Sequence, residues 1–344
     1  MKLDHRDFMR VASETGLDGA QAERFWQALA DGAAKRPGFD LVHVLYYFGG
    51  LIVIGAVSWF MTATWDALGP NGILVMSVLI GAALLALGNT LWRRSEATRV
   101  PGGLLIAAAV STTPLIVYSL QDAFGLWPGD APGNYHDFHI WVRGGWAAME
   151  LVTISVGLVA LRFYRLPFLV APIAFTLWYL SMDLTPIIFG SDGYDWRDRQ
   201  LVSLLFGLAM LVTAYLTDLA ARRDFAFWLY LFGMIAFWGG LSSMDSGSEW
   251  GKVIYLLINL ALIALSVFLR QRVFIVFGGL GVFGYLGYLA YDKFADQPLF
   301  MFVLMAAGLA LVFIGIYLQR NRTAILAWAE STIPQGLQQF RPKG

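Results

Sequence analysis

Two carboxylates interrupt stretches of the sequence that are otherwise apolar. Glu150 follows Gly144-Gly-Trp-Ala-Ala-Met, and we expect it about two turns inside the fourth spanning helix, with no residue nearby along that helix able to pair with it. Asp183 follows Trp178-Tyr-Leu-Ser-Met. An ionisable group inside hydrocarbon costs about 2.5 to 3.5 kcal/mol on insertion scales, so it must face protein or water. Such a group suits proton or cation coupling. A protonated or hydrogen-bonded structural Glu close to the outer interface is the alternative interpretation.

Prolines and further polar residues accompany the two acids. Ser111-Thr-Thr-Pro114 contains a proline that frees backbone carbonyls, and Pro186 follows Asp183, where we expect the helix to break. Broken helices at membrane depth are tolerated only beside protein or a cavity. The sequence therefore predicts one polar pocket in the outer half of the membrane, unless these helix ends are simply solvated at the interface. Its predicted lining is Tyr118, Gln121, Asp122, Glu150 and Asp183, with Trp178 as an aromatic wall.

The sequence gives little support for a metal site, a cofactor site or a nucleic-acid interface. The segment Tyr135-His-Asp-Phe-His139 could supply zinc or copper ligands, but an interfacial position is the preferred interpretation, and there is no cysteine. Gly279-Leu-Gly-Val-Phe-Gly284 matches the dinucleotide fingerprint only literally, because no soluble strand precedes it. With Gly278 and Gly287 it predicts a close helix-packing face. We find no Walker loop, zincin pair, nucleophile elbow or basic face, so we predict no cofactor, no metal, no nucleic-acid partner and no enzymatic activity.

The elements that position these residues are apolar helices. Of the 344 residues, 58% are apolar and 14% charged, which is far from the usage of water-soluble domains. Crossing the hydrocarbon core takes about 20 apolar residues. The sequence predicts an all-α polytopic bundle of about ten spans, in contact with the lipid bilayer. The spans lie near 42–64, 70–91, 102–121, 146–161, 166–182, 200–216, 225–243, 252–269, 273–291 and 299–318.

Loop charges predict the orientation of this bundle. With a cytoplasmic N-terminus, nineteen of the 24 Lys and Arg residues fall on the inner side, as the positive-inside rule requires. We therefore expect a multi-pass protein of a bacterial inner membrane with both termini in the cytoplasm. Leu45-Tyr-Tyr-Phe-Gly-Gly50 recurs as Leu229-Tyr-Leu-Phe-Gly-Met234, which indicates repeated helical hairpins.

Both ends of the chain differ from this apolar centre. Residues 1–38 predict a cytoplasmic helical hairpin and linker, 39–319 the transmembrane domain, and 320–344 a cytoplasmic interfacial tail. An apolar stripe on the second short helix predicts a surface that docks on the membrane domain, a second copy of the chain or a cytoplasmic partner. Its binding residues would be Phe25, Trp26 and Leu29.

The N-terminal third also carries a family resemblance. The opening Gly16-Leu-Asp-Gly-Ala-Gln-Ala-Glu-Arg-Phe-Trp26, the entry Arg36-Pro-Gly-Phe-Asp-Leu-Val-His-Val-Leu-Tyr-Tyr-Phe-Gly-Gly50, and Trp59 with Trp65 resemble bacterial membrane proteins with the domain of unknown function 2157. The resemblance implies a small cytoplasmic helical segment followed by many spans. It implies no activity.

Two functions remain open. The first is a transporter or channel for a small solute or ion, with its site among the acids described above; repeated hairpins and proline-interrupted helices favour it, whereas the lack of a charge near any helix centre does not. The second is a membrane scaffold or sensor that binds a cytoplasmic partner through the N-terminal hairpin.

Overall fold

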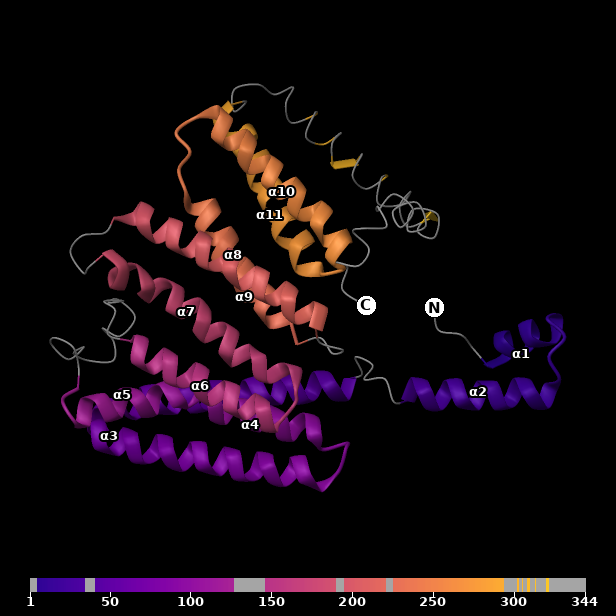
Figure 1. Ribbon diagram of the computed structural model, residues 1–344, viewed down its shortest axis with the longest axis horizontal. Helices are drawn as coiled ribbons and strands as arrows, with labels where there is room; N and C mark the ends of the chain where they lie inside the picture. The colour runs from indigo at the N-terminus through magenta and orange to yellow at the C-terminus, as the bar shows by residue number, and fades with distance from the viewer. Residues whose placement is uncertain are drawn as a thin grey trace. The chain divides into compact units, whose positions relative to one another are not determined.

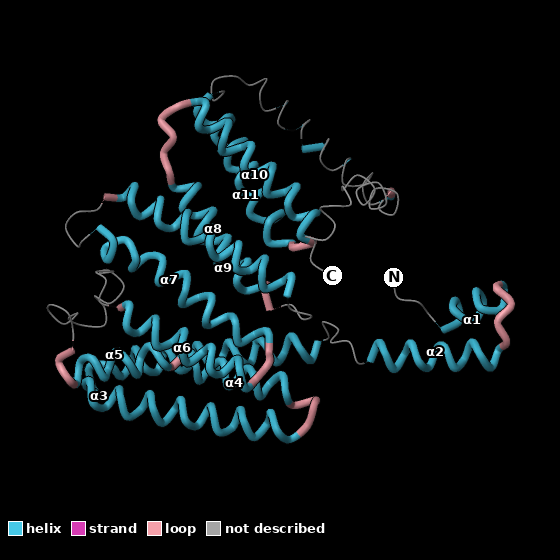
Figure 2. Tube along the Cα trace, viewed as in Figure 1, coloured by secondary structure: helices cyan, strands magenta, loops and turns pink. Residues whose placement is uncertain are grey.

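The computed structural model describes residues 5–34, 41–126, 146–189, 195–220 and 225–293, together with a few isolated positions between 302 and 321. Every regular element in these ranges is helical (Figures 1 and 2), so the all-α prediction is confirmed. The predicted linker, the histidines of the long loop, the tenth span and the C-terminal tail lie outside the described residues or contribute only those isolated positions. The chain divides into two compact units, Met1–Val53 and Ile54–Gly344.

The first unit begins with a helical hairpin. Helix α1 (His5–Glu14) is followed by a turn at Gly16, whose φ of 78° only glycine adopts readily. The Leu17 N–H donates to the Ala12 carbonyl at 3.0 Å, which closes the turn before α2 (Gly19–Ala34). Ala12 and Ala22 are buried. Small residues at these positions let the two helices pack closely.

Helix α3 (Leu41–Arg94) is interrupted at Gly69, where φ is 62° and ψ is 177°. After this interruption Asn71–Arg94 is long and apolar enough to cross a membrane, whereas the apolar stretch before it, Phe48–Val57, is shorter. The predicted second span is therefore present as a candidate. The predicted first span, 42–64, is helical throughout as part of α3.

Six candidate spans occur among the described residues, by helix length and hydropathy. The chain is therefore a multi-pass membrane protein. Two more predicted spans form helices of only 17 residues, α6 (Ala147–Phe163) and α9 (Phe227–Ser243). The six candidates are Asn71–Arg94 of α3; Arg99–Ala123, made of α4 (Arg99–Ser111) and α5 (Thr113–Ala123); Pro167–Pro186, made of η2 (Pro167–Leu169) and most of α7 (Val170–Phe189); α8 (Trp196–Ala220); α10 (Glu249–Leu269); and Arg272–Asp292, made of α11 (Arg272–Tyr288) and most of the π-turn η3 (Leu289–Lys293).

Large apolar side chains cover the outside of these helices. Leu257 of α10 is 58% exposed and Phe283 of α11 is 75% exposed. Water-soluble proteins do not display such continuous apolar surface. These side chains are the ones that contact the lipid bilayer.

Consecutive helices pack closely at glycines. A Cβ on Gly207 of α8 would meet backbone atoms of Phe237 in α9, and a Cβ on Gly278 of α11 would lie 2.7 Å from the Asn259 carbonyl oxygen of α10. Gly281 also faces Asn259, because residues three apart share a helix face. The predicted packing face is thus only partly correct, since Gly279, Gly284 and Gly287 have no neighbour within 4 Å in the described structure.

Candidate functional site

Glu150 lies in the first turn of α6, which begins at Ala147. Its position two turns inside the helix, as predicted, is therefore wrong. The side chain is only 6% exposed. Gly157, seven residues further along the same face, lies against Ile173 of α7. Glu150 consequently faces α7.

Asp183 lies on α7 and is 1% exposed. Its carboxylate accepts a hydrogen bond from the backbone N–H of Trp146, the residue that precedes α6, and it interacts electrostatically with Glu150. The predicted break of the helix at this point is wrong, because α7 continues through Pro186 to Phe189. Asp183 thus caps α6 from a neighbouring helix, and the positive N-terminal end of α6 stabilises negative charge there.

Helix α5 brings the third group of predicted residues beside α6. Tyr118 is buried against Trp146 and Met149. Gln121, three residues on, is 8% exposed, whereas Asp122 is half-buried and interacts electrostatically with Tyr118. The predicted interruption near Pro114 is present, because α4 ends at Ser111 and α5 starts at Thr113. Helices α5 and α7 both contact α6 (Figure 1), and they carry these residues to its N-terminal end.

Trp178 does not accompany the acids. It precedes Asp183 by five residues, which places it about 140° around the helix. Its ring stacks on Phe232 of α9, with centroids 6.2 Å apart and planes at 29°. The ring belongs to the aromatic contacts between α7 and α9.

Arg199 is a neighbour of the acids that sequence reasoning missed. It lies in the first turns of α8 and interacts electrostatically with Asp183. The start of α8 is fixed by reciprocal bonds: Asp195 Oδ1 accepts from the Asp198 N–H at 3.3 Å, and Asp198 Oδ2 accepts from the Asp195 N–H at 3.0 Å. The pattern Asp195-x-x-Asp198 marks the start of a helix. Because this helix directly follows the helix that bears Asp183, the pattern could have indicated that Arg199 lies near that acid.

Three buried oxygens of this cluster have no hydrogen-bond partner within the described part of the chain. They are Glu150 Oε2, Asp183 Oδ2 and Gln121 Oε1. Ser119 Oγ and Thr185 Oγ1 are also unpartnered, but helical geometry puts them on other faces of α5 and α7. Buried polar atoms normally find partners, and carboxylate and amide oxygens are what hard cations prefer. We call Glu150, Asp183, Gln121 and the flanking Arg199 the carboxylate cluster. It offers two carboxylates, one amide and one arginine.

Among the described residues there is no group of three His, Cys, Asp or Glu side chains able to hold a metal ion. His136 and His139, the predicted alternative, lie outside the described residues.

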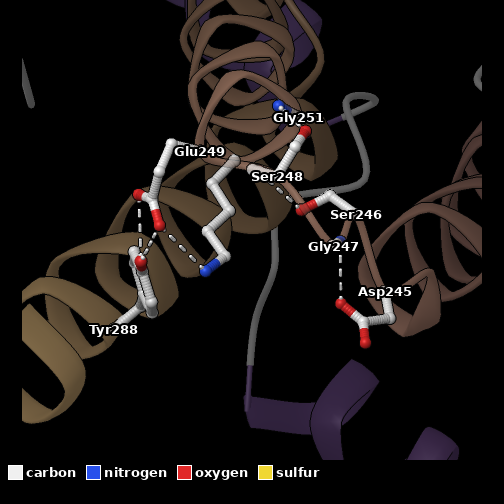
Figure 3. Close-up of polar contacts among 8 residues, drawn as sticks. Asp245, Ser246, Gly247, Ser248, Glu249, Gly251 and Tyr288 are labelled. Atoms are coloured by element: carbon white, nitrogen blue, oxygen red, sulfur yellow. Dashed lines mark hydrogen bonds and ion pairs between the residues drawn. The ribbon is translucent and has the colours of Figure 1, made fainter.

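A polar group at the ends of α10 and α11 is structural in character (Figure 3). The Tyr288 hydroxyl donates to both carboxylate oxygens of Glu249, at 2.9 and 3.0 Å, and Lys252 Nζ lies 3.8 Å from the centre of the Tyr288 ring. Ser248 caps α10 by accepting from the Gly251 N–H at 3.1 Å. These exposed contacts join the two helix ends.

The predicted partner-binding residues differ in their surroundings. Phe25 is 58% exposed. Trp26 is half-buried, with its ring centre 5.4 Å from that of Phe8, and the Leu29 side chain lies outside the described residues. Phe25 is therefore the predicted contact residue that is available on the hairpin surface.

Comparison with protein-family models, with curated proteins and with solved structures found no match. The resemblance to membrane proteins with the domain of unknown function 2157 accordingly stays a prediction.

Proposed function

We propose that the protein is a transporter or channel for a small cation and that Glu150 and Asp183 bind the cation. The observation that carries this proposal is a pair of interacting, buried carboxylates, each with one oxygen that lacks a partner in the described structure. An uncompensated buried charge costs several kcal/mol, on the order given for ions in protein interiors. A cation or a proton supplied from solution would satisfy both oxygens.

The surroundings of the carboxylate cluster fit reversible binding better than permanent neutralisation. Asp183 is stabilised by the N–H of Trp146 and by Arg199. Glu150 lies beside it at the N-terminal end of α6. The positive N-terminal end of α6 favours the ionised form of these carboxylates, which is the form that binds a cation. We place this site in the outer half of a bacterial inner membrane, within a domain of about ten spans whose termini are both cytoplasmic.

The test is cation flux into proteoliposomes that contain the full-length protein. Gradients of protons, sodium or potassium are imposed one at a time. Glu150→Gln and Asp183→Asn each remove one carboxylate charge and keep a side chain of nearly equal size, and the amide oxygen introduced by Asp183→Asn could still accept from the Trp146 N–H. We expect each variant to lose about tenfold or more in flux of the transported cation, because even the loss of an outer-shell partner of a bound metal ion costs about 10- to 100-fold in affinity.

The matched control is Asp245→Asn, because Asp245 is an exposed acid outside the carboxylate cluster. Its flux should equal that of the unmodified protein. Unchanged flux in both Glu150→Gln and Asp183→Asn, measured on folded protein, would rule out the site.

The N-terminal hairpin supports a second candidate, a scaffold or sensor that binds a cytoplasmic partner or a second copy of the chain. Phe25 and Val11 are 58% and 50% exposed. A unit this small buries little apolar surface, so leaving large apolar side chains in water lowers its stability. Deleting residues 1–36, or replacing Phe25 by Gln, should release a co-purifying partner while membrane insertion persists. Flux that survives the deletion would separate this function from the first.

A further inference from the structure

We propose that the end of α3 binds the phosphate of an anionic phospholipid: Arg93 binds the phosphate, and Asn89 and Tyr164 hold the Arg93 side chain in position. This lipid site is separate from the carboxylate cluster. Glu150 lies in the first turn of α6 and Tyr164 follows its last turn, so about 20 Å of helix separates the two sites. The inference does not depend on the proposed function.

One amide oxygen joins three side chains at the lipid site. Asn89 Oδ1 accepts a hydrogen bond from Arg93 Nε at 3.1 Å and another from the Tyr164 hydroxyl, also at 3.1 Å. Asn89 and Arg93 lie one turn apart on α3, and Tyr164 comes from the end of α6. The two bonds therefore hold the guanidinium beside a second helix.

Apolar packing supports this pair of helix ends. The rings of Trp92 and Tyr164 meet edge to face, with centroids 5.5 Å apart and planes at 88°. A Cβ on Gly103 of α4 would meet both Leu166 and the Trp92 ring. Helix α4 therefore packs closely against the same two ends, and the residues that position Arg93 are part of an ordered contact.

Arg93 keeps the groups that bind a phosphate. A guanidinium has five N–H donors in a fixed planar fork, and the bond to Asn89 uses one of them. The Arg93 side chain is exposed, and its two Nη groups can donate to two oxygens of one phosphate, a bidentate geometry that arginine favours. Because Asn89 is neutral, this bond leaves the charge of Arg93 uncompensated.

Basic residues outnumber acids around Arg93. In and next to these ends of α3, α4 and α6, the described residues include five arginines and one acid: Arg93, Arg94, Arg99, Arg162 and Arg165 against Glu96. Glu96 pairs with Arg99 Nη1 at 3.3 Å, and Arg165 has a further interaction, so the lipid site includes neither arginine. In the described structure no carboxylate pairs with Arg93 or Arg94. These two charges attract an anion.

The lipid site lies at the depth where a bilayer presents its phosphates. The candidate span Asn71–Arg94 ends one residue after Arg93, and the end of a span is where the hydrocarbon core meets the headgroups. Phe163, which precedes Tyr164, is 72% exposed and is available to the acyl chains. Basic pockets between spanning helices bind anionic headgroups. A bilayer lipid, which offers both phosphate and acyl chains, is therefore the occupant.

The experiment counts lipids on the full-length protein, purified in detergent and stripped of lipid, by native mass spectrometry. The probes are phosphatidylglycerol and phosphatidylcholine with the same acyl chains, and the readout is the ratio of their dissociation constants. We expect phosphatidylglycerol to bind at least about tenfold more tightly, and Arg93→Gln to bring the ratio close to one. Arg93→Lys keeps the charge without the fork, and Tyr164→Phe removes one bond to Asn89, so each should lower the ratio by a smaller factor. A purely structural defect would weaken both lipids alike and leave the ratio unchanged.

The matched control is Arg272→Gln, which removes an exposed arginine from the first turn of α11, at the end of another candidate span. Its ratio should equal that of the unmodified protein. Equal losses in Arg93→Gln and Arg272→Gln would show that interfacial charge in general attracts the lipid, and would overturn the site. Equal affinities for the two lipids in the unmodified protein would overturn it too, as would displacement of phosphatidylglycerol by an equal concentration of inorganic phosphate. Melting temperatures verify folding, and Arg93→Lys keeps the test decisive if Arg93→Gln does not fold.

Discussion

The packing of α10 against α11 permits a quantitative test at Gly281. A Cβ at this position would fall on the side-chain amide of Asn259. That amide cannot easily turn aside, because Asn259 is fully buried, its Oδ1 accepts from Trp238 Nε1 at 3.0 Å, and its Nδ2 donates to the Tyr255 carbonyl at 2.8 Å. Gly281→Ala must therefore push the helices apart or break the bond from Trp238.

The magnitude follows from those two costs. Overpacking a well-packed contact costs about 1 to 3 kcal/mol, and an interhelical side-chain hydrogen bond in a membrane protein contributes about 0.6 kcal/mol. Gly279→Ala is the matched control, because Gly279 lies on the same helix with no neighbour within 4 Å in the described structure, so both variants gain the same helix propensity. The free energy of unfolding should differ between them by about 1.5 to 3.5 kcal/mol.

Denaturant titration in detergent micelles measures this difference. In an Asn259→Ala background the obstacle is gone, so Gly281→Ala should cost no more than Gly279→Ala. If Gly281→Ala and Gly279→Ala have equal unfolding free energies in the unmodified background, the close contact between α10 and α11 does not exist and the reasoning fails.

Two further predictions concern other helix contacts. Gly207→Ala should lower the free energy of unfolding by about 1 to 3 kcal/mol relative to Gly239→Ala. The added Cβ at Gly207 would meet backbone atoms of Phe237, which cannot rotate away, whereas Gly239 has open space in the described structure. Thermal unfolding in detergent measures this difference, and equal melting temperatures would contradict the prediction. Tyr288→Phe should cost less than about 1 kcal/mol, because its two bonds to Glu249 are exposed; a loss of several kcal/mol in the same assay would show that these bonds hold the helix ends together.

Helix type and helix ends differ in how well the sequence encodes them. The thickness of a bilayer fixes the length of an apolar segment, so hydropathy locates the helices of the second unit closely. Hydropathy averages over a window, however, and is insensitive to where a helix begins. Glu150, which we expect about two turns inside its helix, therefore lies in the first turn of a helix that starts at Ala147.

The sequence predicts the two acids of the carboxylate cluster but does not predict its arginine. Burial of Glu150 and Asp183 follows from the cost of charge in an apolar stretch, and their convergence follows from the short connection that makes α6 and α7 neighbours. Pro186 misleads the prediction because α7 continues through it to Phe189, although a proline inside a helix removes one backbone hydrogen bond. Sequence reasoning treats Arg199 only as a loop charge, because its approach to Asp183 depends on the tertiary packing of α8.

The contrast between the two carboxylates gives a final test of what they are for. Asp183 caps the N-terminus of α6, so Asp183→Leu should lower stability by about 1 kcal/mol, the usual cost of losing a cap. Glu150 leaves a buried oxygen unpartnered in the described structure, so Glu150→Met, of similar volume, should leave stability unchanged or raise it, as replacement of buried charges by apolar groups often does. Unfolding in detergent compares the two. A residue that can be replaced without loss of stability and is nevertheless required for flux is a binding group, whereas a clear loss of stability in Glu150→Met would make Glu150 a structural residue and remove it from the site.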